Sequence, residues 1–523
     1  MRTNIVFIAL CLFGLAIIGQ LVSIQIIQGE KNKALSEGFF LQSKIKNGER
    51  GEIFFKNGES LAINKSFFSV YTEPPKINDP EKTAQILNQI LNLPVDFILE
   101  KLNKEGTLYS LIKNRISDEA VDGLKKAKLS GIYIKEERGR YFPQETMASQ
   151  LIGFVDANSH GQYGLEAYYN NILTGKNGGK GKDLNLTIDY NVQFYAEKLL
   201  SAAAQNLKIA KGSILILEPS SGRILALANF PNFNPNSYQE YAQDKKLEIF
   251  QNEATLSLFE PGSIFKPITM AAALEEDKIT PDTKYTDTGI VQIGSYSIKN
   301  YDDKVYGLQT MTNVLEKSIN TGAVFAERQL GNNLFLKYLE KFGFFKRTGA
   351  DLSEVYSQNK EFKKGYEINF ANAAFGQGIQ VTLMQLAKAY SALANGGKLA
   401  TPHLADNFPL ENSEQIISTK TASQITSMLV SVVDNGLVKG AKIPGYYIAG
   451  KTGTAQVAEK GGYSSDKTIQ SFVGFFPAFH PQFLILVKLD DPQTKTAGYS
   501  ALPIFRDLAD YIIHLYQIPP DYQ

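Results

Sequence analysis

Three short groups of residues have the types and order needed for serine acyl-transfer chemistry. They are Ser263-Ile264-Phe265-Lys266, Ser318-Ile319-Asn320 and Lys451-Thr452-Gly453. A serine hydroxyl is a poor nucleophile until a base removes its proton. A lysine can be that base when burial and a neighbouring positive charge lower its pKa. We therefore interpret Ser263 as a nucleophile that forms an acyl-enzyme and Lys266 as its base, with the other two groups closing the opposite walls of a cleft.

The sequence around Ser263 separates it from other serines that have a lysine three residues later. Ser263 follows the turn signal Glu260-Pro261-Gly262 and precedes an apolar run from Ile268 to Leu274. This context predicts a helix that begins at Ser263, with Lys266 one turn further on the same face. The remaining serine–lysine pairs at this spacing are interpreted as surface pairs; they are Ser43/Lys46, Ser110/Lys113, Ser357/Lys360 and Ser464/Lys467.

Composition narrows the class of protein. A chain of 523 residues is long enough for two or more domains. Its 54 basic and 53 acidic residues give almost no net charge, which argues against a nucleic-acid-binding protein. Cys11 is the single cysteine, so no intrachain disulfide can form, and the four histidines have no metal-ligand spacing. We expect no metal and no cofactor, and we disfavour a histidine-based serine triad.

The N-terminus predicts a membrane anchor. No charged residue lies between Arg2 and Glu30. The apolar stretch Ile5–Ile27 would be roughly 34 Å long as a helix, which exceeds a bilayer core of about 30 Å. A cleaved signal peptide is the alternative, but the segment offers no good small-residue cleavage site. We expect residues 1–29 to be an uncleaved single-pass anchor in the cell membrane, with a cytoplasmic N-terminus and an extracytoplasmic chain from Glu30 onward.

The chain after the anchor divides into two regions. Residues 30–182 carry none of the three motifs. Segments 50–53 and 57–62 predict a strand, a turn with Gly58 in a left-handed conformation, and another strand, and helices are predicted at Asp79–Leu93 and Val95–Leu102. The glycine-rich basic segment 175–182 is the candidate boundary. Residues 183–523 alternate helical and strand patterns and predict a sheet covered by helices. The expected elements there are helices at Val192–Ala204, Val381–Asn395, Ala422–Val433 and Pro503–Leu515, hairpins at 213–228 and 471–489, and a strand at Tyr446–Ile448 that leads into Lys451.

The three motifs, in this order and spacing, resemble those of the penicillin-binding proteins and serine β-lactamases. Nearly the whole chain is similar to a class B penicillin-binding protein, the monofunctional peptidoglycan D,D-transpeptidase. Further segments carry this resemblance; they are Arg50-Gly51-Glu52-Ile53, Arg140-Tyr141-Phe142-Pro143, Gly164-Leu165-Glu166, Gly376-Gln377-Gly378 and Phe472-Val473-Gly474-Phe475. The resemblance implies an α+β multidomain fold: the anchor, an elongated β-rich pedestal over 30–182, and a penicillin-binding domain over 183–523 with a central antiparallel sheet covered by helices.

The resemblance also implies roles for the second motif and for the base. Ser318 would relay a proton toward the leaving amine. Asn320 would hydrogen-bond both the substrate amide and Lys266. Lys451 would be the second cation near Lys266, which helps to lower the pKa of that base.

The third motif would bind the substrate. The resemblance implies that Lys451 and Thr452 hold the terminal carboxylate of the substrate and that Gly453 lets the substrate lie against the strand. The oxyanion hole would consist of the backbone N–H groups of Ser263 and Thr454.

The implied reaction joins two peptidoglycan stem peptides, a donor and an acceptor, and β-lactams would acylate the same serine. A division role is favoured over elongation because 69–74 and 153–155 look closer to the septal type. Polar residues in the anchor at Gln20, Ser23 and Gln25 suggest contact with a partner helix, and interfacial water is the alternative. The resemblance identifies the partner as a SEDS-type glycan polymerase, together with division proteins. The alternatives are an elongation-type transpeptidase, a D,D-carboxypeptidase or β-lactamase, and a division scaffold without catalytic activity.

Overall fold

The structure is a computed structural model. It describes residues 49–522, except 105, 176–178, 244–245, 407–412 and 460–461, together with the isolated positions 13, 14, 17 and 20. The anchor expected at Ile5–Ile27 lies outside the described residues apart from those four positions. Among the helices of the described part, none has the length and apolar character needed to cross a bilayer.

The chain forms two compact units that do not follow the chain order strictly. Among the described residues, the smaller unit contains 49–52, 62–141 and 171–182, and the larger unit contains 53–61, 142–170 and 183–522. The sequence placed a single boundary at 182/183. In space, segments 53–61 and 142–170 pack with the larger unit, so the chain passes between the units several times.

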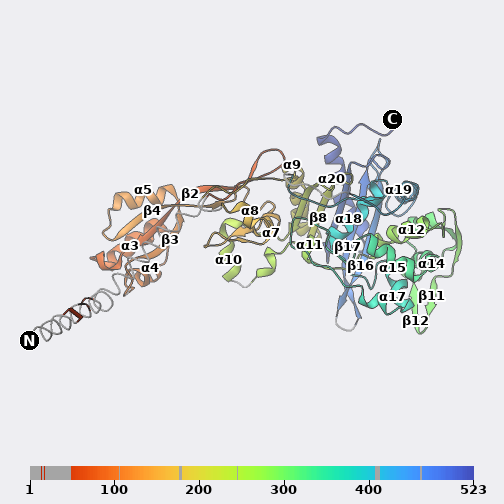
Figure 1. Cartoon of the computed structure of the whole chain (residues 1–523), viewed down its shortest axis with the longest axis horizontal. Helices are drawn as coiled ribbons and strands as arrows, with labels where there is room; N and C mark the ends of the chain where they lie inside the picture. Colours follow the sequence, from red (N-terminus) through yellow and green to blue (C-terminus); the bar gives the residue numbers. More distant parts are fainter. Residues whose placement is uncertain are drawn as a thin grey trace, which may run out of the picture. The chain divides into compact units, whose positions relative to one another are not determined.

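The smaller unit is a mixed α/β layer. Strand β2 (Ser60–Thr72) pairs in antiparallel fashion with β3 (Ser110–Ile116) and with β4 (Ile132–Tyr141). Helices of this unit include α3 (Pro80–Leu91), α4 (Val95–Leu102) and α5 (Asp118–Ala127), which lie around these strands (Figure 1). Their apolar faces share one core with β2 and β3. The predicted helices at 79–93 and 95–102 are confirmed. Asp79 caps the first by accepting the N–H of Lys82 at 3.0 Å, and Pro94 separates the two.

The larger unit is built on one antiparallel sheet. Its strand order is β16 (Ala449–Glu459), β17 (Gly462–Phe476), β18 (Phe483–Asp490), β8 (Lys211–Leu217) and β9 (Ile224–Phe230). Strands β8 and β18 are buried at almost every residue, and successive side chains point to opposite faces, so both faces of the sheet are covered. The helices packed against it include α9 (Tyr190–Leu207), α18 (Leu383–Ala394), α19 (Thr419–Asp434) and α20 (Ala501–Leu515). The expected antiparallel sheet covered by helices is confirmed.

The strand predicted at Tyr446–Ile448 is wrong. Strand β16 begins only at Ala449, and Tyr446 makes an isolated bridge with Ile443 around a turn in which Gly445 has φ of +86°. A short apolar run next to a strand does not show on which residue the strand begins.

Helix α12 (Lys266–Glu275) lies inside the larger unit and is buried at every position from Lys266 to Leu274. Helix α14 (Asn320–Leu330) packs against it. Before α14 the chain forms two small antiparallel pairs, β10 (Lys284–Asp287) with β13 (Gly307–Thr310) and β11 (Ile290–Ile293) with β12 (Tyr296–Lys299). Figure 1 labels β11 and β12 beside α14 and α17 (Glu367–Ala373). Buried residues of this hairpin share a core with α14 and α17.

Candidate active site

The candidate nucleophile lies in a tight turn that leads into α12. Ser263 belongs to the 3₁₀ helix η7 (Gly262–Phe265), and the α-helix begins at Lys266, where the backbone N–H donates to the Ser263 carbonyl. Ser263 is half-buried, whereas Lys266 is fully buried. The predicted helix start is therefore observed three residues later for the α-helix proper, with Ser263 and Lys266 still one turn apart.

The Lys266 ammonium group lies among oxygen atoms of the second motif. Its Nζ donates to the Ser318 carbonyl at 2.5 Å and to Asn320 Oδ1 at 2.8 Å, and it lies 3.2 Å from Ser318 Oγ. The carbonyl and the amide oxygen can only accept, so they use two N–H groups of Lys266. A neutral lysine has two such groups, and its lone pair is then left for a hydroxyl proton. The geometry therefore suits a neutral amine acting as a base.

Lys451 is the second cation of the cluster. It lies on β16, is 2% exposed, and donates to Ser318 Oγ at 3.0 Å and to the Thr452 carbonyl at 3.1 Å. Burial lowers the pKa of Lys451 to about 7. Burial, and then the charge of Lys451, lower the pKa of Lys266 well below its ordinary value. The structure thus supplies both conditions that the sequence required for a lysine base.

Ser318 connects the two lysines. Its hydroxyl oxygen lies within hydrogen-bond distance of both Nζ atoms, and so it provides a route along which a proton can pass. Ser318 has φ of +56°, a left-handed conformation that a residue with a side chain adopts at an energetic cost. It lies between α13 (Met311–Glu316) and α14. In this conformation the Ser318 carbonyl faces Lys266 and accepts its hydrogen bond.

The third motif lies on the edge strand β16. Because β16 has a neighbouring strand on one side in the described sheet, alternate backbone groups of 451–454 face away from β17. The structure gives Gly453 a role beyond the expected room for substrate. A Cβ at Gly453 would lie 2.5 Å from Ser471 Oγ and 2.9 Å from the Pro261 carbonyl oxygen. Glycine is therefore needed for β16 to approach the nucleophile turn. Thr452 and Thr454 remain partly exposed.

A second turn supports the nucleophile turn. Gly376 accepts the N–H of Gly262 at 3.0 Å and has φ of +82°, and a Cβ there would lie 2.2 Å from the Gly262 carbonyl oxygen. Gly378 donates its N–H to Glu260 Oε1 at 3.1 Å, and Tyr463 donates its hydroxyl to Glu260 at 3.0 Å. The Gly376–Gly378 segment, which the sequence identified only by resemblance, thus holds the residues that precede Ser263.

Sequence reasoning missed the residues that hold Asn320. The backbone N–H of Asn320 donates to Asn300 Oδ1 at 3.0 Å, and its side-chain Nδ2 donates to the Lys299 carbonyl at 2.9 Å. Both partners lie outside the motifs, about twenty positions earlier in the chain. Neither the spacing nor the residue types of this segment could have indicated the contact.

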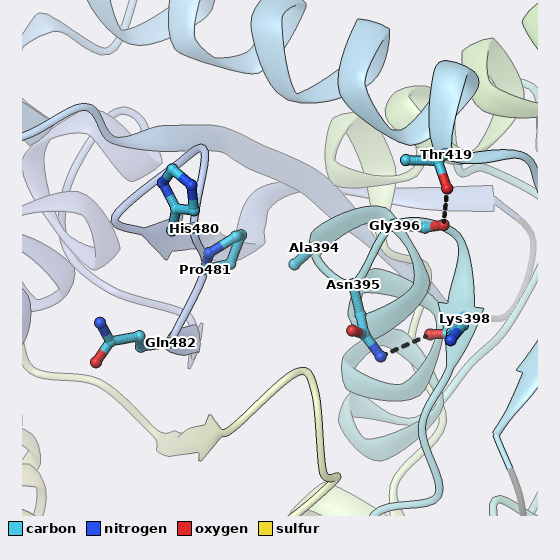
Figure 2. A pocket seen from close by; sticks show the side chains of 8 residues that line it. All are labelled: Ala394, Asn395, Gly396, Lys398, Thr419, His480, Pro481 and Gln482. Atoms are coloured by element: carbon cyan, nitrogen blue, oxygen red, sulfur yellow. Dashed lines mark hydrogen bonds between the residues drawn. The ribbon is translucent and has the colours of Figure 1, made fainter. Parts of the chain in front are cut away.

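Two other features of the described residues lack the arrangement of a second site. No group of three or more histidine, cysteine or acidic side chains in that part of the chain is arranged to hold a metal ion. A surface groove lies elsewhere in the larger unit, between the loop 480–482 and the turn after α18 (Figure 2). Its polar groups bond within one wall: Thr419 to the Gly396 carbonyl at 3.3 Å and Asn395 to the Lys398 carbonyl at 3.4 Å. The hydroxyl among its lining residues, on Thr419, donates to the Gly396 carbonyl and not to a base.

Comparisons with known proteins agree with the geometry. Residues 212–510 match the penicillin-binding protein transpeptidase domain, and residues 45–186 match the penicillin-binding protein dimerisation domain. The chain is 32% identical to stage V sporulation protein D of Bacillus subtilis, over 92% of this chain and 80% of that one. It is 27% identical to the peptidoglycan D,D-transpeptidase FtsI of Escherichia coli K12, over 90% of this chain and 84% of that one.

A solved structure shows the same fold. Penicillin-binding protein 3 of Mycobacterium tuberculosis, in complex with ampicillin, matches with a TM-score of 0.72 and 25% identity, over 91% of this chain and 96% of that one. The match to the transpeptidase domain covers more than half of the chain, and both buried lysines, Lys266 and Lys451, lie within it. The chain therefore belongs to the class B penicillin-binding proteins, the family of peptidoglycan D,D-transpeptidases.

Proposed function

We propose that this protein cross-links peptidoglycan stem peptides through an acyl-enzyme on Ser263. The observation that carries the proposal is the buried cluster in which Lys266 and Lys451 share Ser318 Oγ. Ser263 Oγ attacks the carbonyl of the D-Ala–D-Ala bond and forms an ester, and its proton passes to Lys266. Ser318 relays a proton to the leaving amine of D-Ala. The amine of a second stem peptide then attacks the ester, forms the new amide and returns the serine hydroxyl.

The strand β16 would position the donor peptide. Lys451 and Thr452 bind its terminal carboxylate, and the N–H groups of Ser263 and Thr454 stabilise the oxyanion. Asn320 holds both the substrate amide and Lys266. A bound carboxylate beside Lys451 favours the charged form of that lysine, so substrate binding would itself restore the positive charge that burial disfavours.

The test is labelling by a fluorescent penicillin followed by peptide mapping. We expect a stable adduct on Ser263 and none on Ser263→Ala. Ser357→Ala is the matched control, because Ser357 is another serine with a lysine three residues later, and its hydroxyl donates to the Gln380 carbonyl at 2.7 Å. Labelling that survives Ser263→Ala would refute the nucleophile. Rapid release of hydrolysed penicillin, or hydrolysis of stem peptide in the presence of an amine acceptor, would instead indicate a β-lactamase or carboxypeptidase.

We also propose that the enzyme serves division rather than elongation. The segments 69–74 and 153–155 support this because they resemble the septal type more closely. The measurement is the position of a tagged, penicillin-labelled protein in growing cells. Mid-cell enrichment is expected, and an even distribution along the side wall would refute the division role.

Finally, we propose that residues 1–29 anchor the protein in the cell membrane and contact a SEDS-type polymerase. The support is the uncharged stretch between Arg2 and Glu30, together with its polar positions Gln20, Ser23 and Gln25. Replacing Ile5–Ile27 by an unrelated apolar span should keep penicillin binding and weaken co-purification with the polymerase. Unchanged co-purification after that swap and after disruption of Arg50–Ala62 would contradict this interface.

A further inference from the structure

A buried polar cluster lies directly beneath the start of α14. It consists of Asp287 at the end of β10, Asn300 just after β12, and Thr321 in the first turn of α14. These side chains belong to residues that are 1%, 5% and 3% exposed. Buried polar groups are retained at little cost only when they are hydrogen-bonded, and here each bonds to the others.

Asn300 acts as the N-terminal cap of α14, although it is not adjacent in sequence. The first N–H groups of a helix have no partner inside the helix, and Ile319 at the cap position has no side chain that could accept them. Asn300 Oδ1 accepts the N–H of Asn320 at 3.0 Å and the N–H of Thr321 at 3.2 Å. The start of α14 is therefore fixed by a residue 20 positions earlier.

This cap also determines which way the Asn320 amide faces. Its Nδ2 donates to the Lys299 carbonyl at 2.9 Å, on the residue next to Asn300. With the amide nitrogen held on that side, Oδ1 is directed at Lys266 Nζ, 2.8 Å away. A rotated amide would present a donor to Lys266 and lose the Lys299 bond. The segment 299–300 thus fixes both the backbone and the side chain of Asn320.

Asp287 in turn fixes Asn300. Asn300 Nδ2 lies 3.0 and 2.9 Å from the two carboxylate oxygens of Asp287 and 3.0 Å from the Lys304 carbonyl. Asp287 also accepts N–H groups from Gly289 at 3.0 Å and Tyr306 at 2.8 Å, and the Thr321 hydroxyl at 2.6 Å. Burial alone would raise the pKa of Asp287, but these hydrogen bonds outweigh it and lower the pKa. The carboxylate is therefore a fixed acceptor at the base of the cluster.

We propose that Asn300, held by Asp287, is a positioning residue for the transpeptidase reaction: it caps α14 and aims Asn320 Oδ1 at the base Lys266. The inference rests on the proposed roles of Lys266 and Asn320. The segment from β10 to β13, which lies outside the three motifs, thus positions a residue of the second motif.

The first test is Asn300→Ala, with Gln292→Ala as the control. Gln292 is exposed on β11 of the same hairpin, where it pairs with Ser297 of β12 and not with Asn300. We expect the second-order rate constant for acylation by a fluorescent penicillin to fall about 10- to 100-fold in Asn300→Ala and to stay unchanged in Gln292→Ala. We also expect the acid limb of the pH profile to move to lower pH. When Asn320 Oδ1 no longer faces Lys266, the protonated form of Lys266 is stabilised less, while the neighbouring charge of Lys451 is unchanged. The pKa of Lys266 therefore falls, and the acid limb follows it.

The shape of the pH profile separates positioning from folding. Partial unfolding does not lower the pKa of Lys266. Because the buried lysines make the folded protein less stable as the pH falls, partial unfolding could move the acid limb only to higher pH, opposite to the shift expected here. If Asn300→Ala keeps the wild-type rate, or loses rate without moving the acid limb, the positioning role is overturned. Labelling of the wild-type protein tests the proposed function separately. If Ser263 of the wild-type protein is not labelled at all, the proposed function is wrong. If the wild type and Asn300→Ala are labelled equally fast, only the positioning role of Asn300 is wrong.

A second test uses the charge of the pair. Asn300→Asp keeps an acceptor for α14 but places a second carboxylate about 3 Å from Asp287, so like charges repel. We expect a loss of at least 30-fold in acylation for Asn300→Asp. Adding Asp287→Asn removes the repulsion and supplies a donor, and should recover at least fivefold. Asp287→Asn alone, nearly the same shape as the wild type, should lose about 3- to 10-fold. No recovery in the double variant would show that Asn300 and Asp287 do not act as a pair.

Discussion

The two walls that meet at Lys266 are held in different ways. The strand wall, residues Lys451–Thr454 of β16, is placed by close packing against the turn before Ser263, with glycine where an added carbon would overlap Ser471 and Pro261. The helix wall, residues Ser318–Asn320, is placed by directed hydrogen bonds from Asn300 and Lys299. One wall is fixed by the volume of its atoms and the other by the direction of its donors and acceptors.

This difference predicts different sensitivities. A close-packed contact fails when atoms are added, because the interior has no spare volume. A hydrogen-bonded contact fails when an acceptor or a favourable backbone conformation is removed, because a buried group loses its partner. The strand wall should therefore respond most to small increases in size, and the helix wall to changes that keep size but alter polarity or φ.

The largest effect should follow from adding one methyl group to the strand wall. In Gly453→Ala the new Cβ meets the backbone oxygen of Pro261 at 2.9 Å and Ser471 Oγ at 2.5 Å, so β16 must move away from the nucleophile turn. We expect acylation by penicillin to fall on the order of 100-fold, because a displacement near 1 Å can cost that much. The free energy of unfolding should fall by about 1–3 kcal/mol. Acylation kinetics and denaturant unfolding measure the two.

Gly498→Ala is the matched control, since its Cβ would meet only Thr496 Oγ1, at an ordinary 3.6 Å. It should change the acylation rate by less than about twofold. Equal losses in Gly453→Ala and Gly498→Ala would show that the strand wall is not limited by packing at Gly453.

The sequence predicted the strand wall and the nucleophile turn better than the support of the helix wall. Ser263, Lys266 and Lys451 could be proposed as site residues because each belongs to a short motif of particular residue types, and the structure brings Lys266 and Lys451 to the same hydroxyl, Ser318 Oγ. The cap of α3 is local as well, because Asp79 accepts the N–H of Lys82, three residues later in the chain. Asn300 could not be identified from the sequence. It reaches its partners Asn320 and Thr321 only because two pairs of four-residue strands fold before α14, and such short strands have weak sequence patterns. The start of β16 was also missed, since the apolar run before Ala449 continues the strand pattern into a turn.

The buried lysine pair makes the free energy of unfolding depend on pH, and Lys451 of the strand wall is one source of this dependence. Burial lowers the pKa of Lys451 to about 7 in the folded protein, whereas the pKa of a lysine in an unfolded chain is about 10.4. Between these values the unfolded chain binds more protons, so the free energy of unfolding rises with pH. The rise is at most about 1.4 kcal/mol per pH unit for each lysine. Denaturant unfolding between pH 7 and 9.5 measures it.

Lys451→Met should flatten this rise, because it removes the buried charge and also the charge that lowers the pKa of Lys266. Lys420→Met is the control, as that side chain is exposed on α19 and pairs only with exposed Asp277 at 3.2 Å among its described contacts. The free energy of unfolding of the wild type could instead fall as the pH rises over this range, or its pH slope could be the same in Lys451→Met. Either result would show that burial of Lys451 does not cause the pH dependence.

The smallest effect tests whether the helix wall stores backbone strain at Ser318. Ser318→Ala and Ser318→Gly both remove the hydroxyl that bridges the lysines, so both should lose acylation to a similar extent. They differ in the cost of φ at +56°, which glycine adopts freely and alanine does not. We expect Ser318→Gly to be more stable than Ser318→Ala by about 1 kcal/mol, even though glycine usually destabilises a folded chain relative to alanine. Chemical denaturation of the two variants measures the difference. Equal stabilities, or a more stable alanine variant, would mean that the carbonyl of residue 318 reaches Lys266 without strain and that hydrogen bonds alone hold this wall.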